Sequence, residues 1–442
     1  MSRWAHAAAR RHRVLRFRRT IRAALLLAAI LAGTRAQAQA ESPPVLAIVG
    51  GTVRTGEGPD LPRATIVVRG ERIAAVGPDV VVPTGARVID AQGLIVTPGL
   101  VAVQAPLGLL EIDLEPSTVD ASAGTDDPIR AAFSAADGYD PRSTLVAIAR
   151  TGGITSAVST PTGGLVSGTS AWVDLDGERV TEAVVQPVLA VHADVTEAGV
   201  DAAGGALPSA MLRLRELLDD ARLYARRRAD YDRRAMRESR VSRLDLERMQ
   251  AVLTRRVPLV VRVSRASDID RVLELARRER LRLVLAGAEE GWRLAERIAA
   301  ENVPVIVTPL HNLPVSFDAL ASRHDNAALL SRAGVRVVLA TPDVHNLRNL
   351  RQEAGNAVRF GMDPAAALRA VTVEPARVFG MEADRGRIAP GQLANVAIWS
   401  GDPFETTTYL VNLLIRGRTV SLETRQSALL RRYRTLTRST PP

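Results

Sequence analysis

A chain of 442 residues is long enough for one large domain and a smaller one, each with its own core. Cysteine is absent, which excludes disulfides and thiol catalysis, and lysine is absent too, which excludes a Schiff base and a carbamylated-lysine metal bridge. The formal charge of +10 suggests nucleic-acid binding, but residues 1–40 hold nine arginines and no carboxylate, so the remainder carries about +1. We therefore expect no nucleic-acid partner.

Residues 1–40 have the three parts of a bacterial-type signal peptide: an arginine-rich start, an apolar stretch at 23–33 and the cleavage motif Ala38-Gln39-Ala40. The apolar stretch is too short to span a bilayer, and we expect no membrane span in the mature chain. We predict cleavage after Ala40 and a periplasmic or secreted protein; the general secretory route is favoured over the twin-arginine route. An exported protein whose intact mass still includes the leader would contradict this prediction.

Short β-rich runs separated by turn residues occupy both ends of the mature chain. Near the start, Gly70-Glu71 is a two-residue hairpin connection between Thr65–Arg69 and Arg72–Val76. The same pattern returns over residues 386–420. We predict a small composite β-sandwich built from residues 41–97 and 383–425, followed by a tail at 426–442.

Residues 98–382 alternate apolar strand-like runs with amphipathic helical stretches, which is typical of a (β/α)8 TIM-like barrel and of the α/β class. Ser209–Arg240 reads as one long charged helix, either a solvated surface helix or one that reaches a partner. The clearest predicted strands are Ile154–Ser159, Val184–Val191, Pro258–Val263, Arg282–Ala286, Val303–Thr308 and Val335–Ala340.

The run Val-Ile-Asp-Ala at 88–91, followed by Pro98-Gly99 and an apolar strand, resembles the amidohydrolase superfamily. In that signature the strand ends in Asp-x-His-x-His. Here Ala102 stands at the Asp, and Gln104 and Pro106 stand at the two His positions. The residues that flank the motif are therefore present, but its two histidines are not.

The resemblance continues along the chain. Arg262 lies in Pro258–Ile269, which is similar to the family's fifth-strand segment, and it stands where relatives place a His. Gly287 stands at the next His position, in the segment similar to the sixth strand. Ala340–Asp343 is similar to the family's Thr-Asp, with the Asp displaced by one residue, and Gly386–Ala394 is similar to the closing motif. The family implies a hydrolase of non-peptide C–N bonds that uses a metal to activate water. Because four imidazoles are replaced, we expect no metal and no other cofactor.

Three histidines, His192, His311 and His345, follow predicted strands, and the carboxyl ends of such strands line the active face of a barrel. With Asp194 and Asp343 they would form a relocated metal or acid/base site, or they are unrelated loop residues. We select Asp343, His345 and Arg262 as candidate catalytic residues, and His192, His311, Gly163 and Gly164 as candidate ligand-binding residues.

Two of these selections carry a specific geometry. Arg262 is expected to point into the barrel mouth, buried and paired with a carboxylate such as Asp343 or Glu111. The alternative is that it turns outward toward the helix layer. Gly163 and Gly164 belong to Thr160–Ser170, a predicted loop whose N–H groups would cradle an anion, unless the glycines only permit a tight turn.

Three functions remain open. The favoured one is a pseudoenzyme or ligand-binding barrel whose mouth binds a small molecule. The second is an active hydrolase with a relocated metal or a metal-free acid/base site. The third is a structural subunit paired with an active paralogue, so homo-oligomerisation and paralogue pairing both stay open.

Overall fold

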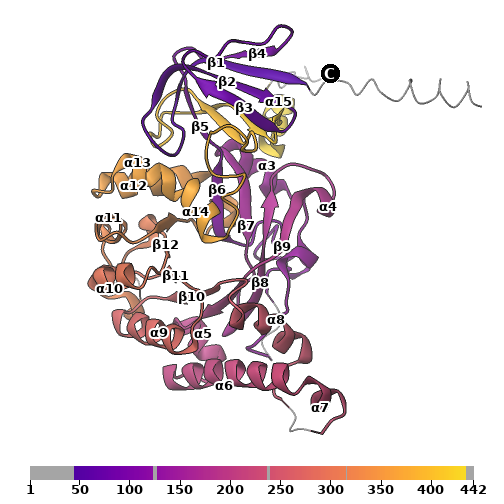
Figure 1. The fold of residues 1–442 in the computed structure, drawn as a ribbon, viewed down its shortest axis with the longest axis vertical. Helices are drawn as coiled ribbons and strands as arrows, with labels where there is room; N and C mark the ends of the chain where they lie inside the picture. The colour runs from indigo at the N-terminus through magenta and orange to yellow at the C-terminus, as the bar shows by residue number, and fades with distance from the viewer. Residues whose placement is uncertain (1–43, 123–126, 236–238, 315, 435–442) are drawn as a thin grey trace, which may run out of the picture. The chain divides into compact units, whose positions relative to one another are not determined.

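The computed structural model describes residues 44–122, 127–235, 239–314 and 316–434 (Figure 1). The predicted leader at 1–40 lies outside these residues. Within the described ranges, every helix is too short or too polar to cross a membrane.

The small domain is one hydrogen-bonded sheet assembled from both ends of the chain. β5 and β14 pair in antiparallel fashion, with Val96 opposite Ile398, so this contact joins the two segments. The predicted hairpin is present, because β2 and β3 pair with Arg69 opposite Arg72. The strands are Val45–Val53 (β1), Leu61–Arg69 (β2), Arg72–Gly77 (β3), Arg87–Asp90 (β4), Ile95–Pro98 (β5), Val396–Trp399 (β14), Leu410–Ile415 (β15) and Arg418–Thr419 (β16).

The large domain is built on a second sheet of eight strands in the order β13-β12-β11-β10-β9-β8-β7-β6, which forms a nearly closed barrel and confirms the predicted class. Among the described residues, β6 and β13 do not pair; the N–H of Val101 on β6 instead donates to the carbonyl of Val371. The strands are Leu100–Ala105 (β6), Ile154–Ser159 (β7), Val166–Asp174 (β8), Val184–Asp194 (β9), Leu259–Val263 (β10), Leu283–Gly287 (β11), Val305–Val307 (β12) and Val337–Leu339 (β13).

One strand departs from a regular (β/α)8 arrangement. β8 runs antiparallel to both neighbours, with Val158 of β7 opposite Trp172 and Ala190 of β9 opposite Ser170. The prediction that Thr160–Ser170 is a loop is therefore wrong for residues 166–170. This strand was missed because its Ser and Thr residues interrupt the apolar alternation that predicts a strand from sequence. In the structure its whole length is buried.

The strand residues alternate between two cores. Val260, Val284, Ile306 and Val338 point into the barrel and pack together with Trp172. Their immediate neighbours on the same strands pack outward against the helices. This alternation is the period of two that β-structure imposes, and it fixes which side chains at the strand ends can enter the barrel mouth.

Helices cover the outer face of the barrel, and α9, α10 and α11 lie beside β10, β11 and β12 in Figure 1. The predicted helix at 209–240 is shorter than expected: α6 ends at Arg226, because Arg227 leaves the helical conformation. The helices are Ala135–Gly138 (α2), Thr144–Thr151 (α3), Val180–Ala183 (α4), Glu197–Ala202 (α5), Leu207–Arg226 (α6), Arg228–Asp232 (α7), Arg243–Leu253 (α8), Ala266–Glu279 (α9), Ala295–Ala300 (α10), Asn326–Arg332 (α11), Leu350–Arg359 (α12), Pro364–Ala370 (α13), Val373–Val378 (α14) and Arg425–Tyr433 (α15).

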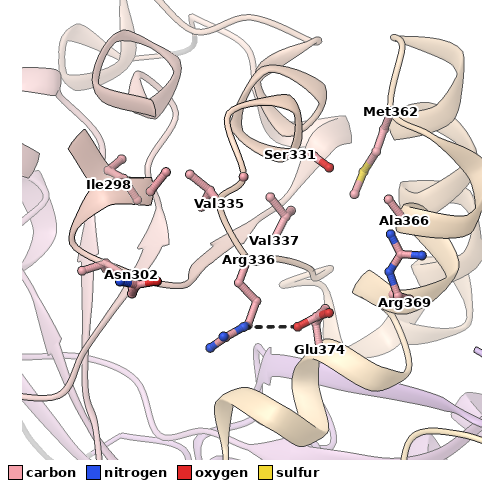
Figure 2. A pocket seen from close by; sticks show the side chains of 13 residues that line it. Ile298, Asn302, Ser331, Val335, Arg336, Val337, Met362, Ala366, Arg369 and Glu374 are labelled. Atoms are coloured by element: carbon pink, nitrogen blue, oxygen red, sulfur yellow. Dashed lines mark ion pairs between the residues drawn. The ribbon is translucent and has the colours of Figure 1, made fainter. Parts of the chain in front are cut away.

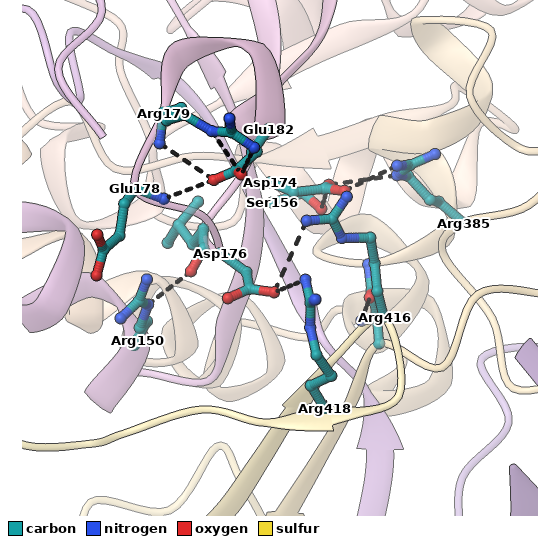
Figure 3. A network of polar contacts seen from close by, with 12 residues as sticks. Arg150, Ser156, Asp174, Asp176, Glu178, Arg179, Glu182, Arg385, Arg416 and Arg418 are labelled. Atoms are coloured by element: carbon teal, nitrogen blue, oxygen red, sulfur yellow. Dashed lines mark hydrogen bonds and ion pairs between the residues drawn. The ribbon is translucent and has the colours of Figure 1, made fainter. Parts of the chain in front are cut away.

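Short 3-10 helices complete the connections: Pro116–Thr118 (η1), Gly291–Leu294 (η2), Pro309–His311 (η3), Phe317–Ala319 (η4) and Val344–Asn349 (η5). A buried ion pair ties the barrel to the segment that returns to the small sheet. Asp174 at the end of β8 accepts from Arg385, Nη2 to Oδ2 2.8 Å, and from the hydroxyl of Ser156 at 2.8 Å (Figure 3).

Candidate functional site

The carboxyl ends of β10, β11 and β12 surround a pocket of about 560 Å³, which we call the mouth pocket. Its lining includes Gln104, Arg262 and Gly287, three of the four positions where the family motif places histidine, and His311. The structure therefore brings together residues that are far apart in the sequence. The remaining lining residues are Thr196, Glu197, Ala198, Asp201, Ser264, Ala286, Glu289, Ile306, Thr308, Leu313, Ser316, Asp318, Ala319 and Pro342.

Arg262 lies on β10 two residues after Val260, whose side chain points into the barrel, and it lines the mouth pocket as predicted. The expectation that it is buried and paired is wrong. The side chain is exposed, and it has no ion pair within the part of the chain that the structure describes. Water can solvate an exposed guanidinium, so no carboxylate is needed to offset desolvation. Arg262 is thus a free cation at the pocket wall.

Gln104, the last residue but one of β6, is in the left-handed region with φ 61°, a conformation uncommon outside glycine. Its Nε2 is buried and has no hydrogen-bond partner among the residues that the structure describes. A buried amide donor without a partner costs about 1–3 kcal/mol of desolvation. Because this residue lines the mouth pocket, a ligand carbonyl or carboxylate would satisfy the donor.

Gly287 ends β11 with φ 79°, where a side chain would be strained. A Cβ built there would lie 3.0 Å from Oε2 of Glu289. Burial raises the pKa of Glu289, and the Ser264 hydroxyl and the Arg262 cation oppose that shift. An imidazole at position 287 would therefore need both a different backbone and a displaced Glu289.

His311 stands on η3 with an exposed ring, and its Nδ1 lies 3.6 Å from Oε1 of Glu353. Glu353 belongs to α12 and is buried, with Oε2 accepting the N–H of Leu310 at 2.7 Å. Its other oxygen has no hydrogen-bond partner. Burial raises the pKa of this carboxyl to about 7, and the Leu310 hydrogen bond only partly opposes the shift. The pair lies beside the mouth pocket, which His311 lines.

His192 does not follow a strand as predicted, because β9 continues to Asp194 and includes it. The ring is buried, with Nε2 2.8 Å from the hydroxyl of Ser170 on β8. Burial lowers the pKa of His192 to about 3, so the imidazole is neutral at ordinary pH. It is absent from the lining of the mouth pocket.

Asp343 and His345 also lie outside the mouth pocket. Asp343 caps η5, accepting the N–H of His345 at 3.0 Å and the side-chain amide of Asn346 at 2.7 Å. The ring of His345 contacts the loop after β6, with Nε2 3.1 Å from the carbonyl of Glu111 and Nδ1 3.6 Å from Asp113. These contacts fix the position of the loop after β6 and do not involve the mouth pocket.

Gly163 and Gly164 form the turn from β7 to β8, with φ 85° and 70°. A Cβ at Gly164 would lie 2.8 Å from the carbonyl of Pro128, so the chain is packed closely there. Asp194 is likewise occupied, since its Oδ1 accepts both the N–H and the hydroxyl of Thr196. The predicted candidates thus divide: Arg262 and His311 meet at the mouth, while the others serve local structure.

Sequence reasoning missed Glu353 and Glu289. Glu353 had a signal, because Leu350, Ala354 and Ala357 place it on the apolar face of a helix, where a carboxylate is unusual. Glu289 comes two residues after the end of β11, in the kind of segment where a barrel presents its active-face residues.

The chain resembles known proteins in sequence and in fold. Residues 217–423 match the model of the amidohydrolase family. The search of curated proteins gives no match. Among solved structures, an amidohydrolase from Thermotoga maritima has a TM-score of 0.78 at 22% identity, covering 85% of this chain and 99% of that chain.

Two further structures share the fold. An adenosine deaminase from Xanthomonas campestris with bound zinc has a TM-score of 0.53 at 21% identity, covering 89% of this chain and 98% of that one. Molinate hydrolase has a TM-score of 0.55 at 17% identity, covering 86% and 95%. The family match over residues 217–423 and the shared fold agree with the resemblance to the amidohydrolase superfamily that the motifs indicated.

The family that this chain resembles uses a metal centre, which sets requirements for the residues of the site. A hydrolytic zinc site needs about three converging imidazole or carboxylate ligands and an open position for water. Within the described ranges, no three His, Asp or Glu side chains group closely enough to hold a metal ion. The residues present therefore do not fit the family's metal centre.

Proposed function

We propose that this protein is a ligand-binding member of the amidohydrolase superfamily. Its mouth pocket would take a small molecule that carries a carboxylate or an amide carbonyl. The observation that carries this proposal is the joint placement in one pocket of Arg262, an exposed cation without an ion pair among the described residues, and Gln104, whose buried Nε2 has no hydrogen-bond partner there. A guanidinium offers a planar fork of N–H donors that matches a carboxylate, and the amide of Gln104 adds another donor.

The same residues support the loss of the family's metal-dependent step. Neither a guanidinium nor a glycine has a lone pair for a metal, and the fixed charge of Arg262 would repel one. The left-handed backbone at Gly287 further disfavours a ligand there. The proposed function therefore includes no metal-dependent hydrolytic step.

A second candidate function rests on His311 and Glu353. Hydrolysis of an amide-like C–N bond needs a base that takes a proton from water while the oxygen attacks the carbonyl carbon. The second ring nitrogen of His311 could take that proton, with Glu353 orienting the ring, and return it to the departing amine. Arg262 and Gln104 would stabilise the oxyanion. Molinate hydrolase and phenylurea hydrolase B share the fold, which makes this chemistry a relevant alternative.

Purified mature protein distinguishes these functions. We expect no stoichiometric zinc, manganese or iron by elemental analysis, and binding of N-acetylglycine, which has both a carboxylate and an amide, by calorimetry. Arg262→Ala should weaken binding at least about tenfold, since a charge-assisted bond contributes about 1.5–3 kcal/mol. Arg69→Ala, which removes an exposed arginine at the end of β2, is the matched control.

About one metal ion per chain, lost in His311→Ala, would contradict the proposal and indicate a relocated metal site. Metal-free release of glycine from N-acetylglycine, abolished by His311→Ala, would instead establish the second function. Absence of binding together with a stable complex with another subunit would favour the structural role. Export of the mature chain and pairing with itself or a paralogue stay predictions.

A further inference from the structure

A second hollow lies at the opposite end of the barrel, where β11, β12 and β13 begin. Its volume is about 480 Å³, and its lining contains six arginines and one carboxylate, Glu301. We call it the arginine hollow; its arginines are Arg255, Arg277, Arg280, Arg282, Arg336 and Arg377. Apolar residues such as Leu283 and Val303 complete the lining.

The carboxylates around this hollow are already engaged in ion pairs, two of them with arginines of the hollow itself. Glu301 pairs with Arg297 at 2.9 Å, and Arg277 pairs with Glu274 at 2.9 Å. Glu374 is shared between Arg336 at 3.4 Å and Arg377 at 3.1 Å, and Figure 2 shows the first of these pairs.

Three arginines of the hollow remain without a carboxylate partner among the described residues: Arg255, Arg280 and Arg282. Arg282 is half-buried and donates from Nη2 to the carbonyl of Val378 at 2.6 Å. Burial lowers the pKa of Arg282; Glu382 opposes the shift, and the nearby Arg255 and Arg336 lower it further. Six cations thus line one concavity that has fewer carboxylates than arginines, which raises the potential there.

The positive surface continues into an adjoining hollow of about 280 Å³ that shares Asn302, Val303 and Arg336. Arg369 of α13 lines that second space, and Figure 2 shows it on the far side of Glu374 from Arg336. It too has no ion pair in the part of the chain that the structure describes. Uncompensated cations therefore extend along this end of the barrel.

We propose that the arginine hollow is a binding site for a phosphate-bearing ligand, separate from the mouth pocket. Arginine binds phosphate oxygens with two parallel N–H bonds, and a concave site with low-dielectric walls strengthens that attraction. The apolar lining suits a small organic group attached to the phosphate. Because active sites of such barrels lie at the other face, this site binds without taking part in mouth-pocket chemistry.

The test uses full mature protein at low salt, with inorganic pyrophosphate in calorimetry and vesicles of phosphatidylglycerol or phosphatidylcholine in a sedimentation assay. Arg255→Gln with Arg280→Gln removes two exposed cations, and we expect at least about tenfold weaker binding. The control is Arg63→Gln with Arg215→Gln, which removes the same charge from exposed, unpaired positions; Arg63 shares the left-handed backbone of Arg255 and Arg280.

Binding of pyrophosphate that is weakened only by the hollow variant supports a site for a soluble phosphorylated ligand. Selective sedimentation with phosphatidylglycerol, weakened in the same variant alone, supports a lipid headgroup as the source of the phosphate. If neither probe binds, or if the control variant weakens binding equally, the proposal is overturned.

Discussion

Replacing Asp174 by alanine is expected to lower the free energy of unfolding by about 3–5 kcal/mol, the usual cost of breaking a buried ion pair. Asp174 is fully buried and Arg385 is 7% exposed, so the substitution removes the buried partner of the guanidinium and leaves it only Asp384, at 2.8 Å and 30% exposed. The hydroxyl of Ser156 loses its acceptor at the same time. Urea denaturation followed by circular dichroism measures the change.

Two variants show whether the unpaired charge is the cause. Asp174→Val combined with Arg385→Met removes both charges and should recover part of the lost stability, because no buried charge then remains. Asp219→Ala breaks the exposed pair with Arg222 and should change stability little. A loss below about 1 kcal/mol in Asp174→Ala would show that the pair does not hold β8 to the returning segment.

Glu353→Gln is expected to remove a fall in stability as the pH rises toward neutrality. The folded pKa of Glu353 is raised by burial to about 7 from an ordinary 4.5. Between these values the unfolded chain releases the proton first, so the free energy of unfolding falls with rising pH, by up to about 3 kcal/mol in total. Glutamine cannot ionise, so the variant should lack this slope between pH 4.5 and 7.

Thermal unfolding at several pH values measures the slope, with Glu296→Gln on the exposed face of α10 as the control. A wild-type protein whose stability is flat over this range would contradict a neutral buried carboxyl. If the second function holds, His311 and Glu353 should also set the pH profile of hydrolysis, and Glu353→Gln should shift that profile.

The sequence by itself determined the scaffold. The Val-Ile-Asp-Ala run at 88–91 and Pro98-Gly99 carry the family frame, and the small sheet joins both ends of the chain as predicted. The resemblance of Pro258–Val263 to the family's fifth strand also led to the prediction that Arg262 enters the barrel mouth, where it lines the mouth pocket. Such features need only neighbouring residues, so they can be read without the fold.

The tertiary structure decided everything that depends on burial and on distant partners. β8 runs antiparallel because the chain reverses tightly at Gly163 and Gly164, and its polar residues are buried by neighbours that lie outside the segment. His192 is neutral because the barrel encloses it, while Glu353 reaches His311 only once α12 packs beside η3. Desolvation and convergence arise from contacts between remote segments, and no local pattern encodes them.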